Sequence, residues 1–221
     1  MDSLEDRYHR LKTVLPPQVK LIAVSKTRTV EEIRALYDLG QRAFGENYPQ
    51  ELKEKQPQLP GDIEWHFIGH LQTNKVKVIA PFVHLVHSAD SERLLDELDK
   101  RANTAGRRIN VLIQVHVAQE ETKHGFTPDE LRRAAPEWGG RWPNLSVQGI
   151  MAMASLTNDR MLIDGEFKAA SGLFDDLKAV AVFPAESFTH LSMGMSGDMD
   201  LAMARGSTMV RVGTALFGER H

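Results

Sequence analysis

The sequence of 221 residues has no cysteine, no long apolar run and no marked excess of charge of one sign. The lack of cysteine excludes disulfides, thiolate metal sites and a cysteine nucleophile, and it favours a reducing, cytoplasmic location. No stretch approaches the ~20 apolar residues that span a bilayer. The polar, acidic beginning of the chain is unlike a signal peptide. We therefore expect a cytoplasmic protein with no membrane partner.

The charges of the chain nearly balance. Lys and Arg number 27 and Asp and Glu 30, which gives a formal net charge of −3. This balance argues against nucleic acid or an anionic membrane surface as a partner. The length suits one large domain with a sizeable core, so we expect residues 1–221 to form a single domain.

Short apolar runs alternate with helix-like segments along the chain. The runs predicted as strands are residues 19–24, 42–46, 63–68, 83–86, 109–117, 147–153, 190–193 and 209–214. A helix is predicted over 2–14, and helical patterns follow every strand but the last. Such alternation implies parallel strands covered on both faces. An open doubly wound sheet and a closed barrel both fit, and the count of eight favours a (β/α)8 TIM barrel with an extra N-terminal helix.

Functional residues of a parallel barrel gather where its strands end. Lys26 directly follows the first strand, so its stem begins inside the barrel. Desolvation lowers the pKa of a lysine, and a neutral amine can form a Schiff base with an aldehyde. The spacing alone favours a solvated lysine at the start of a loop.

Two features suggest a phosphate site. Ser196 lies in a Gly-Met-Ser-Gly-Asp run after the seventh strand, where it is a natural N-cap for the next helix. Gly213 and Thr214 end the eighth strand. Either feature alone fits a plain turn. The loops after strands seven and eight, however, are the recurrent phosphate site of this barrel, so the two together predict one here.

Closely spaced histidines are a weaker signal, for a metal site, than the features that suggest a phosphate site. His66 and His70 are four residues apart, and His84 and His87 are three apart. Such spacings pair ligands on a helix, but these residues lie in or beside predicted strands. No acidic cluster is evident nearby to complete a ligand set, so we expect no metal.

The strand ends, taken together, resemble one family, the YggS/PROSC family of pyridoxal phosphate (PLP) homeostasis proteins. The resemblance runs from about residue 19 to the end of the sequence. The matching motifs are Ala23-Val24-Ser25-Lys26, Phe44-Gly45-Glu46-Asn47-Tyr48, Trp65-His66-Phe67-Ile68-Gly69, Leu71-Gln72-Thr73-Asn74-Lys75, Leu191-Ser192-Met193-Gly194-Met195-Ser196 and Val210-Arg211-Val212-Gly213-Thr214-Ala215-Leu216-Phe217-Gly218.

The resemblance implies a barrel similar to the N-terminal domain of alanine racemases, and it assigns a role to each strand end. Lys26 would carry PLP as a Schiff base. Asn47 would lie near the ring oxygen of the cofactor, and Arg211 would face its pyridine nitrogen. Ser196, with the backbone amides of Gly213 and Thr214, would form the phosphate cradle. His116 departs from the asparagine usual in the family, and Lys123 would serve as a secondary contact.

The resemblance also implies a function. PLP acts as an electron sink when its ring nitrogen is protonated, whereas an arginine only donates hydrogen bonds and so favours an unprotonated nitrogen. We expect a monomer that binds PLP, takes part in PLP homeostasis and supply to apo-enzymes, and has little or no catalysis of its own. The alternative is an amino-acid racemase. The sequence lacks the second, β-rich domain of alanine racemases, which argues against that. An unrelated phosphosugar-binding barrel enzyme is a third possibility.

Overall fold

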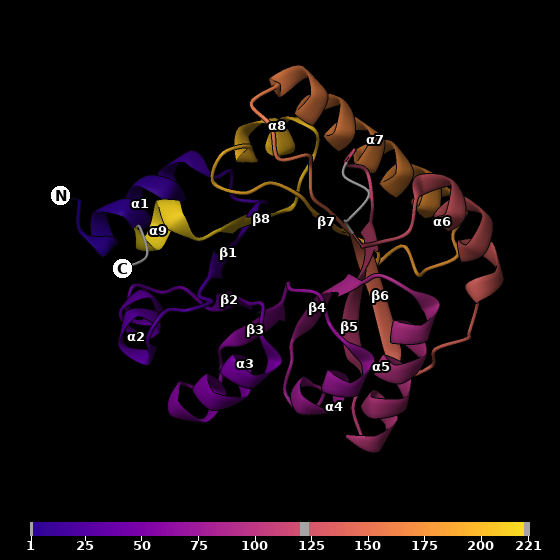
Figure 1. Cartoon of the computed structure of the whole chain (residues 1–221), viewed down its shortest axis with the longest axis horizontal. Coiled ribbons are helices and arrows are strands. Elements are labelled where there is room, and N and C mark those ends of the chain that lie inside the picture. Colours follow the sequence, from indigo (N-terminus) through magenta and orange to yellow (C-terminus); the bar gives the residue numbers. More distant parts are fainter. Residues whose placement is uncertain (1, 120–123, 219–221) are drawn as a thin grey trace.

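The computed structural model describes residues 2–119 and 124–218, which form a closed barrel of parallel strands surrounded by helices (Figure 1). The strands are β1 (Lys20–Val24), β2 (Ala43–Glu46), β3 (Glu64–Phe67), β4 (Leu85–Ala89), β5 (Ile109–Val115), β6 (Leu145–Ala152), β7 (His190–Ser192) and β8 (Met209–Val212). They pair in sequence order, and β8 closes the barrel on β1 with Ile22 opposite Arg211. The predicted eight-stranded (β/α)8 barrel is confirmed, and the open sheet is excluded.

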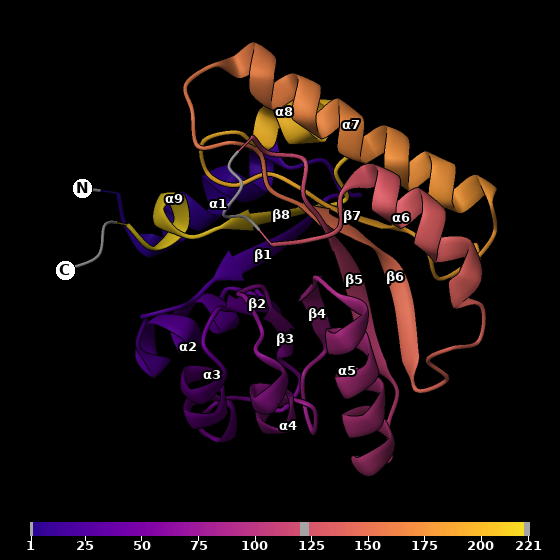
Figure 2. The same cartoon turned by 45° about the vertical axis from the view of Figure 1, so that its right-hand side comes forward.

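Helices cover the outside of the barrel in both views (Figures 1 and 2). They are α1 (Leu4–Val14), α2 (Val30–Asp38), α3 (Pro49–Lys55), α4 (Val76–Ile79), α5 (Glu92–Thr104), α6 (Pro128–Ala134), α7 (Arg160–Ala179), α8 (Met199–Ala204) and α9 (Thr214–Phe217). The predicted N-terminal helix is present as α1. The last strand, expected to have no helix after it, is followed by the short α9.

The ends of the described chain lie side by side (Figure 2). Arg7 of α1 donates hydrogen bonds to the carbonyl oxygens of Leu216 at 2.7 Å and Phe217 at 3.2 Å. These oxygens belong to the last turn of α9, where backbone acceptors lack partners within the helix. The N-terminal helix therefore holds the segment that directly follows β8.

The apolar core has two layers. The larger layer lies between the strands and the helices. The smaller fills the inside of the barrel and consists of Ile22, Ala43, Leu85, Leu112, Met151 and Met209. Side chains on a strand alternate in direction, so His87 and Arg211, two residues beyond Leu85 and Met209, also point inward. The carboxyl-terminal half of the interior is therefore polar where it approaches the ends of the strands.

One predicted helix start is wrong. The N-cap of α8 is Asp198 and not Ser196. The Asp198 carboxylate turns back to accept a hydrogen bond from the backbone N–H of Met195, so residues 195–198 form a turn before the helix begins. Ser196 is exposed in this turn.

None of the helices within residues 2–119 and 124–218 is long and apolar enough to cross a membrane.

Candidate functional site

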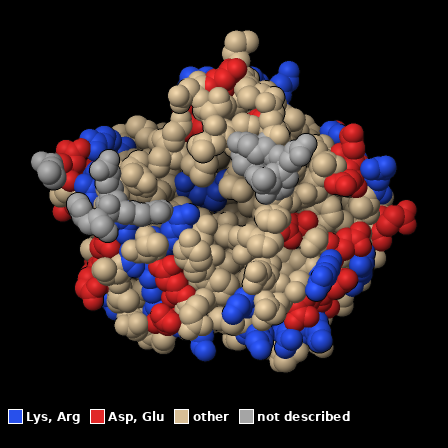
Figure 3. Space-filling model, in the orientation of Figure 1, with Lys and Arg blue, Asp and Glu red and all other residues tan. Residues whose placement is uncertain are grey.

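The strand ends surround one cavity of about 340 Å³, which we call the mouth cavity. Its lining residues are Val24, Lys26, Asn47, Ile68, Met153, Met195, Ser196, Gly197, Arg211, Gly213 and Thr214. All six residues that the sequence singled out as cofactor ligands are among them. The space-filling view shows Lys and Arg atoms in the central hollow of this face (Figure 3), and the two cationic side chains that line the mouth cavity are Lys26 and Arg211.

Lys26 lies at a sharp turn immediately after β1. The next residue, Thr27, has a φ of 63°, which is unusual for a β-branched residue. The turn is held because the Thr27 N–H donates to a carboxylate oxygen of Glu51 at 2.5 Å. Backbone strain of this kind persists only where the surroundings impose it, and it is common at functional sites. The turn directs the half-buried Lys26 into the mouth cavity.

A buried ionic cluster lies behind this turn. Lys55 of α3 donates to Glu46 at 2.8 Å, to Glu51 at 2.6 Å and to the carbonyl oxygen of Ser25 at 2.8 Å. The Ser25 hydroxyl donates to the same Glu46 oxygen at 2.6 Å. Burial raises the pKa of Glu46, opposed by the charge of Lys55. The cluster ties the ends of β1 and β2 to α3 and so fixes the backbone on either side of Lys26.

Asn47 contributes an amide to the wall of the mouth cavity. Its Oδ1 is buried and has no hydrogen-bond partner within the described residues. The loop after β3 packs tightly against it, because a Cβ on Gly69 would lie 2.3 Å from the Asn47 carbonyl oxygen. Only glycine permits this approach. A buried polar atom without a partner is costly, so Asn47 is poised to bind a ligand.

Arg211 is held firmly inside the barrel and is 4% exposed. Its Nη1 donates to the carbonyl oxygen and hydroxyl of Ser192 at 2.8 and 2.6 Å, and its Nη2 to the Ala152 carbonyl oxygen at 3.0 Å. Burial lowers the pKa of Arg211 to about 10, so the guanidinium stays charged at neutral pH. Arg211 also lines the mouth cavity, so its guanidinium can donate to a ligand there.

A chain of buried hydrogen bonds continues from Arg211 through the barrel. The Ser192 hydroxyl lies 3.0 Å from Nδ1 of His87, and Nε2 of His87 lies 2.8 Å from Nδ1 of His66. Both imidazoles are fully buried. Burial lowers the pKa of His66 to about 4 and that of His87 well below its usual range. Both rings are therefore neutral. Within the described residues, His87 bonds through both of its ring nitrogens, whereas His66 enters the chain through Nδ1 alone.

The loops after β7 and β8 meet at the other side of the mouth cavity. Gly194 has a φ of 91°, and a Cβ there would lie 2.6 Å from the Ala202 side chain. This glycine lets the loop turn over α8 and present Ser196. Gly213 and Thr214 start α9 beside it. An exposed hydroxyl and the first backbone N–H groups of a helix together can bind an anionic group.

Comparisons with known proteins identify the family of this chain. The family model for the N-terminal domain of alanine racemase matches residues 1–221. The pyridoxal phosphate homeostasis protein of Pasteurella multocida is 41% identical over 207 residues, covering 91% of this chain and 87% of the relative. That of Aquifex aeolicus is 42% identical, with the same coverage. The chain belongs to the YggS/PROSC family of pyridoxal phosphate homeostasis proteins.

Solved structures of similar proteins show the same fold. PipY of Synechococcus elongatus PCC7942 is 36% identical over 98% of this chain and 100% of its own, with a TM-score of 0.92 for the structure without PLP. The structure of PipY with PLP bound has a TM-score of 0.88. An alanine racemase of Clostridium difficile 630 is 16% identical, covers this chain fully with 56% of its own length and has a TM-score of 0.79, which shows the shared fold alone.

The sequence analysis also named His116, as a departure from the family pattern, and Lys123, as a secondary contact. His116 follows β5, is half-buried, and donates its backbone N–H to Phe126 at 2.9 Å. It is not among the residues that line the mouth cavity. Lys123 lies outside the described residues.

Acidic residues do lie near the paired histidines, contrary to the expectation from the sequence. Ligand atoms of Glu64, His66 and His84 lie within 4.8 Å of one another, as do those of a second group, His70, Asp90 and His124. The sequence spacing suggested pairs within one segment, whereas parallel strands bring together residues of neighbouring segments.

Proposed function

We propose that this protein binds pyridoxal 5'-phosphate in the mouth cavity and takes part in its homeostasis. Lys26 would hold the cofactor, because a lysine amine in this cavity can bond to the PLP aldehyde as a Schiff base, with loss of water. The observation that carries the proposal is the convergence of all six predicted ligands on one cavity. The names of the relatives and the PLP-bound PipY structure support the choice of ligand.

The residues present fit the chemical groups of PLP. Asn47 offers a buried amide without a protein partner to the ring oxygen. Arg211 offers a fixed, charged donor to the ring nitrogen. Ser196, with the backbone N–H groups of Gly213 and Thr214, suits the phosphate. When bound, PLP supplies an electron-withdrawing ring, and a donor-only guanidinium at its nitrogen limits this property.

We further propose that catalysis is slight. Two-sided proton transfer, as in racemisation, needs a second acid–base group opposite the lysine. Apart from Lys26 and Arg211, the described side chains that line the mouth cavity carry no titratable group. Arg211 is a poor base because it stays protonated. The arrangement therefore favours holding and releasing PLP over turning over amino acids.

The spectrum of the purified protein tests PLP binding at Lys26. The protein with PLP should show a visible absorption band that borohydride abolishes, and Lys26→Ala should lack the band. Lys75→Ala is the matched control, because Lys75 is an exposed lysine near the same end of the barrel. A protein that stays colourless with added PLP would contradict the proposal and favour a phosphosugar-binding barrel. A band retained in Lys26→Ala would contradict the assignment of Lys26, because PLP would then bond to another amine.

The racemase alternative has its own test. The PLP-loaded protein is incubated with L-alanine, and D-alanine is measured. Formation of D-alanine at about 1 per second or faster would show an enzyme and overturn the proposal of slight catalysis.

The remaining features of the proposal concern the setting of the protein. We propose that residues 1–221 act as a single domain, as a monomer in the cytoplasm, and that apo-enzymes dependent on PLP are its partners. We expect no nucleic acid partner, because the charges of the chain nearly balance.

A further inference from the structure

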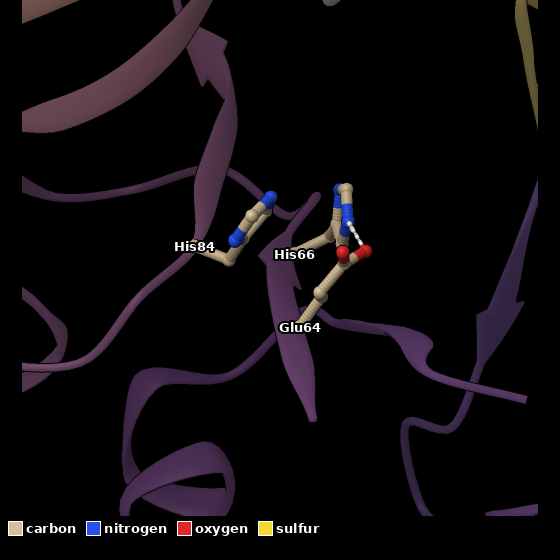
Figure 4. Close-up of side chains that lie close together, drawn as sticks. All are labelled: Glu64, His66 and His84. Atoms are coloured by element: carbon tan, nitrogen blue, oxygen red, sulfur yellow. Dashed lines mark ion pairs between the residues drawn. The ribbon is translucent and has the colours of Figure 1, made fainter. Parts of the chain in front are cut away.

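A second group of chemically active side chains lies at the opposite end of the barrel from the mouth cavity. Glu64 is the first residue of β3, and His84 precedes β4. His66 follows Glu64 by two residues on the same inward face of β3. Ligand atoms of the three residues lie within 4.8 Å of one another, and the close-up shows the carboxylate and both imidazoles gathered on neighbouring strands (Figure 4).

His66 directs an unused nitrogen into this group. The side chain is fully buried, and its Nε2 has no hydrogen-bond partner within the described residues. The nearest carboxylate oxygen of Glu64 lies 3.9 Å away, which is too far for a hydrogen bond. A buried polar atom without a partner costs free energy unless a ligand or water satisfies it. The imidazole is therefore arranged for a ligand that Glu64 also contacts.

The other nitrogen of His66 supports the same interpretation. When Nε2 is an acceptor, Nδ1 carries the hydrogen and donates to Nε2 of His87 at 2.8 Å. His87 then donates from Nδ1 to the Ser192 hydroxyl at 3.0 Å. Histidines that bind metals commonly donate their second ring N–H to a fixed partner in this way. The hydrogen-bond chain thus holds His66 in the tautomer that a metal requires.

We propose that Glu64, His66 and His84 form a binding site for a divalent transition metal ion of the zinc class. Two imidazole nitrogens and one carboxylate oxygen suit such ions better than Mg²⁺ or Ca²⁺, which prefer oxygen ligands. Three protein ligands leave a fourth position for water.

Lys20 competes with the metal for Glu64. It forms an ion pair with this carboxylate, and its side chain is 39% exposed. It can therefore turn into water when another cation arrives. Lys20 and Glu64 also line a cavity of about 330 Å³ at this end of the barrel, which gives an ion a path to the group. His84 and Glu64 are only partly buried, so both can close in on an ion.

The test is metal binding to the full PLP-loaded chain after treatment with a chelator. The background variant is His70→Ala/His124→Ala, which removes the second group of possible ligands. Calorimetry with Zn²⁺ should show one bound equivalent, and Co²⁺ should give the visible bands of a nitrogen- and oxygen-bound ion. Glu64→Gln and His84→Gln should each weaken binding about tenfold or more. Lys20→Met should tighten it, because the competing ammonium is gone.

The metal-binding measurements decide this proposal whether or not PLP bonds to Lys26. The proposal would be overturned if the background variant bound no Zn²⁺. It would also be overturned if Glu64→Gln and His84→Gln, made in that background, bound Zn²⁺ as tightly as the background variant itself. We expect Lys20→Met to bind the metal more tightly, so a variant that fails to fold cannot imitate this result. An unchanged or weaker affinity in Lys20→Met would contradict the proposal. Metal binding and the visible PLP band arise at opposite ends of the barrel, so either can fail alone.

Discussion

Single side chains at the mouth cavity are held from behind by buried partners, and the partners were harder to foresee than the side chains. Lys26 and Asn47 follow a strand and Arg211 lies near the end of one, which are positions that a sequence reveals. Their supports, Lys55 and His87, come from segments far away in the chain. Their proximity depends on the register of neighbouring strands, which apolar patterning does not determine.

Arg211 offers a prediction at this scale. In Arg211→Gln the positive charge facing the cavity is lost, so the ring nitrogen of bound PLP gains a proton more readily. We expect a shift of the visible band of the PLP-loaded protein. We also expect a loss of about 2 kcal/mol in the free energy of unfolding, because buried hydrogen bonds to Ser192 and Ala152 are broken. An unchanged spectrum would show that Arg211 does not contact the ring.

At the scale of elements, the strands and most helices were predictable because their apolar residues recur at the period of each structure. At the start of α2 a capping box fixes where the helix begins: Thr29 accepts from the Glu32 N–H at 3.2 Å, and Glu32 accepts from the Thr29 N–H at 2.8 Å. The start of α8 was not predictable. Serine and aspartate are both good N-caps, and the backbone of the preceding turn decides between them.

The buried ion pair that links α3 to the ends of β1 and β2 should contribute to the stability of the fold. Lys55→Met leaves the carboxylate of Glu46 buried without its partner, so we expect a loss of about 3 kcal/mol or more in the free energy of unfolding. The double variant Glu46→Gln/Lys55→Met should recover part of this loss, because no charge is left buried. Urea unfolding measures both.

The control for this prediction is Lys53→Met, an exposed lysine on the same helix, which should change stability little. Equal losses in Lys53→Met and Lys55→Met would contradict a special role for the buried cluster.

At the scale of the whole molecule, the barrel encloses several buried or partly buried histidines. His66 and His87 are fully buried, and burial lowers the pKa values of both, as it does for the partly buried His84 and His190. The closed barrel itself followed from counting eight apolar strands. The chain of buried hydrogen bonds from Arg211 to His66 could not be inferred, because the sequence does not show which side chains meet inside the barrel.

The histidines predict how stability depends on pH. Each has a lower pKa in the folded protein than in the unfolded chain, so below pH 6.5 the unfolded chain binds more protons and the free energy of unfolding falls. For His66, with a pKa of about 4, the loss approaches about 3 kcal/mol once the pH has fallen through 4. Burial raises the pKa of Glu46, which acts in the opposite sense but is a single group.

Urea unfolding at pH 7.5 and pH 5, with a chelator present, measures this dependence. His190→Gln should reduce the loss on acidification, whereas His9→Gln, an exposed residue of α1, should not. A free energy of unfolding that is equal at both pH values would contradict the assignment of neutral, buried histidines.

The claim on which the account of function depends is that PLP bonds to Lys26. The most direct test is to reduce the PLP-loaded protein with borohydride, digest it and locate the modified lysine by mass spectrometry. We expect one modified peptide, with the reduced adduct on Lys26. An adduct on any other lysine, or no adduct at all, would contradict the account.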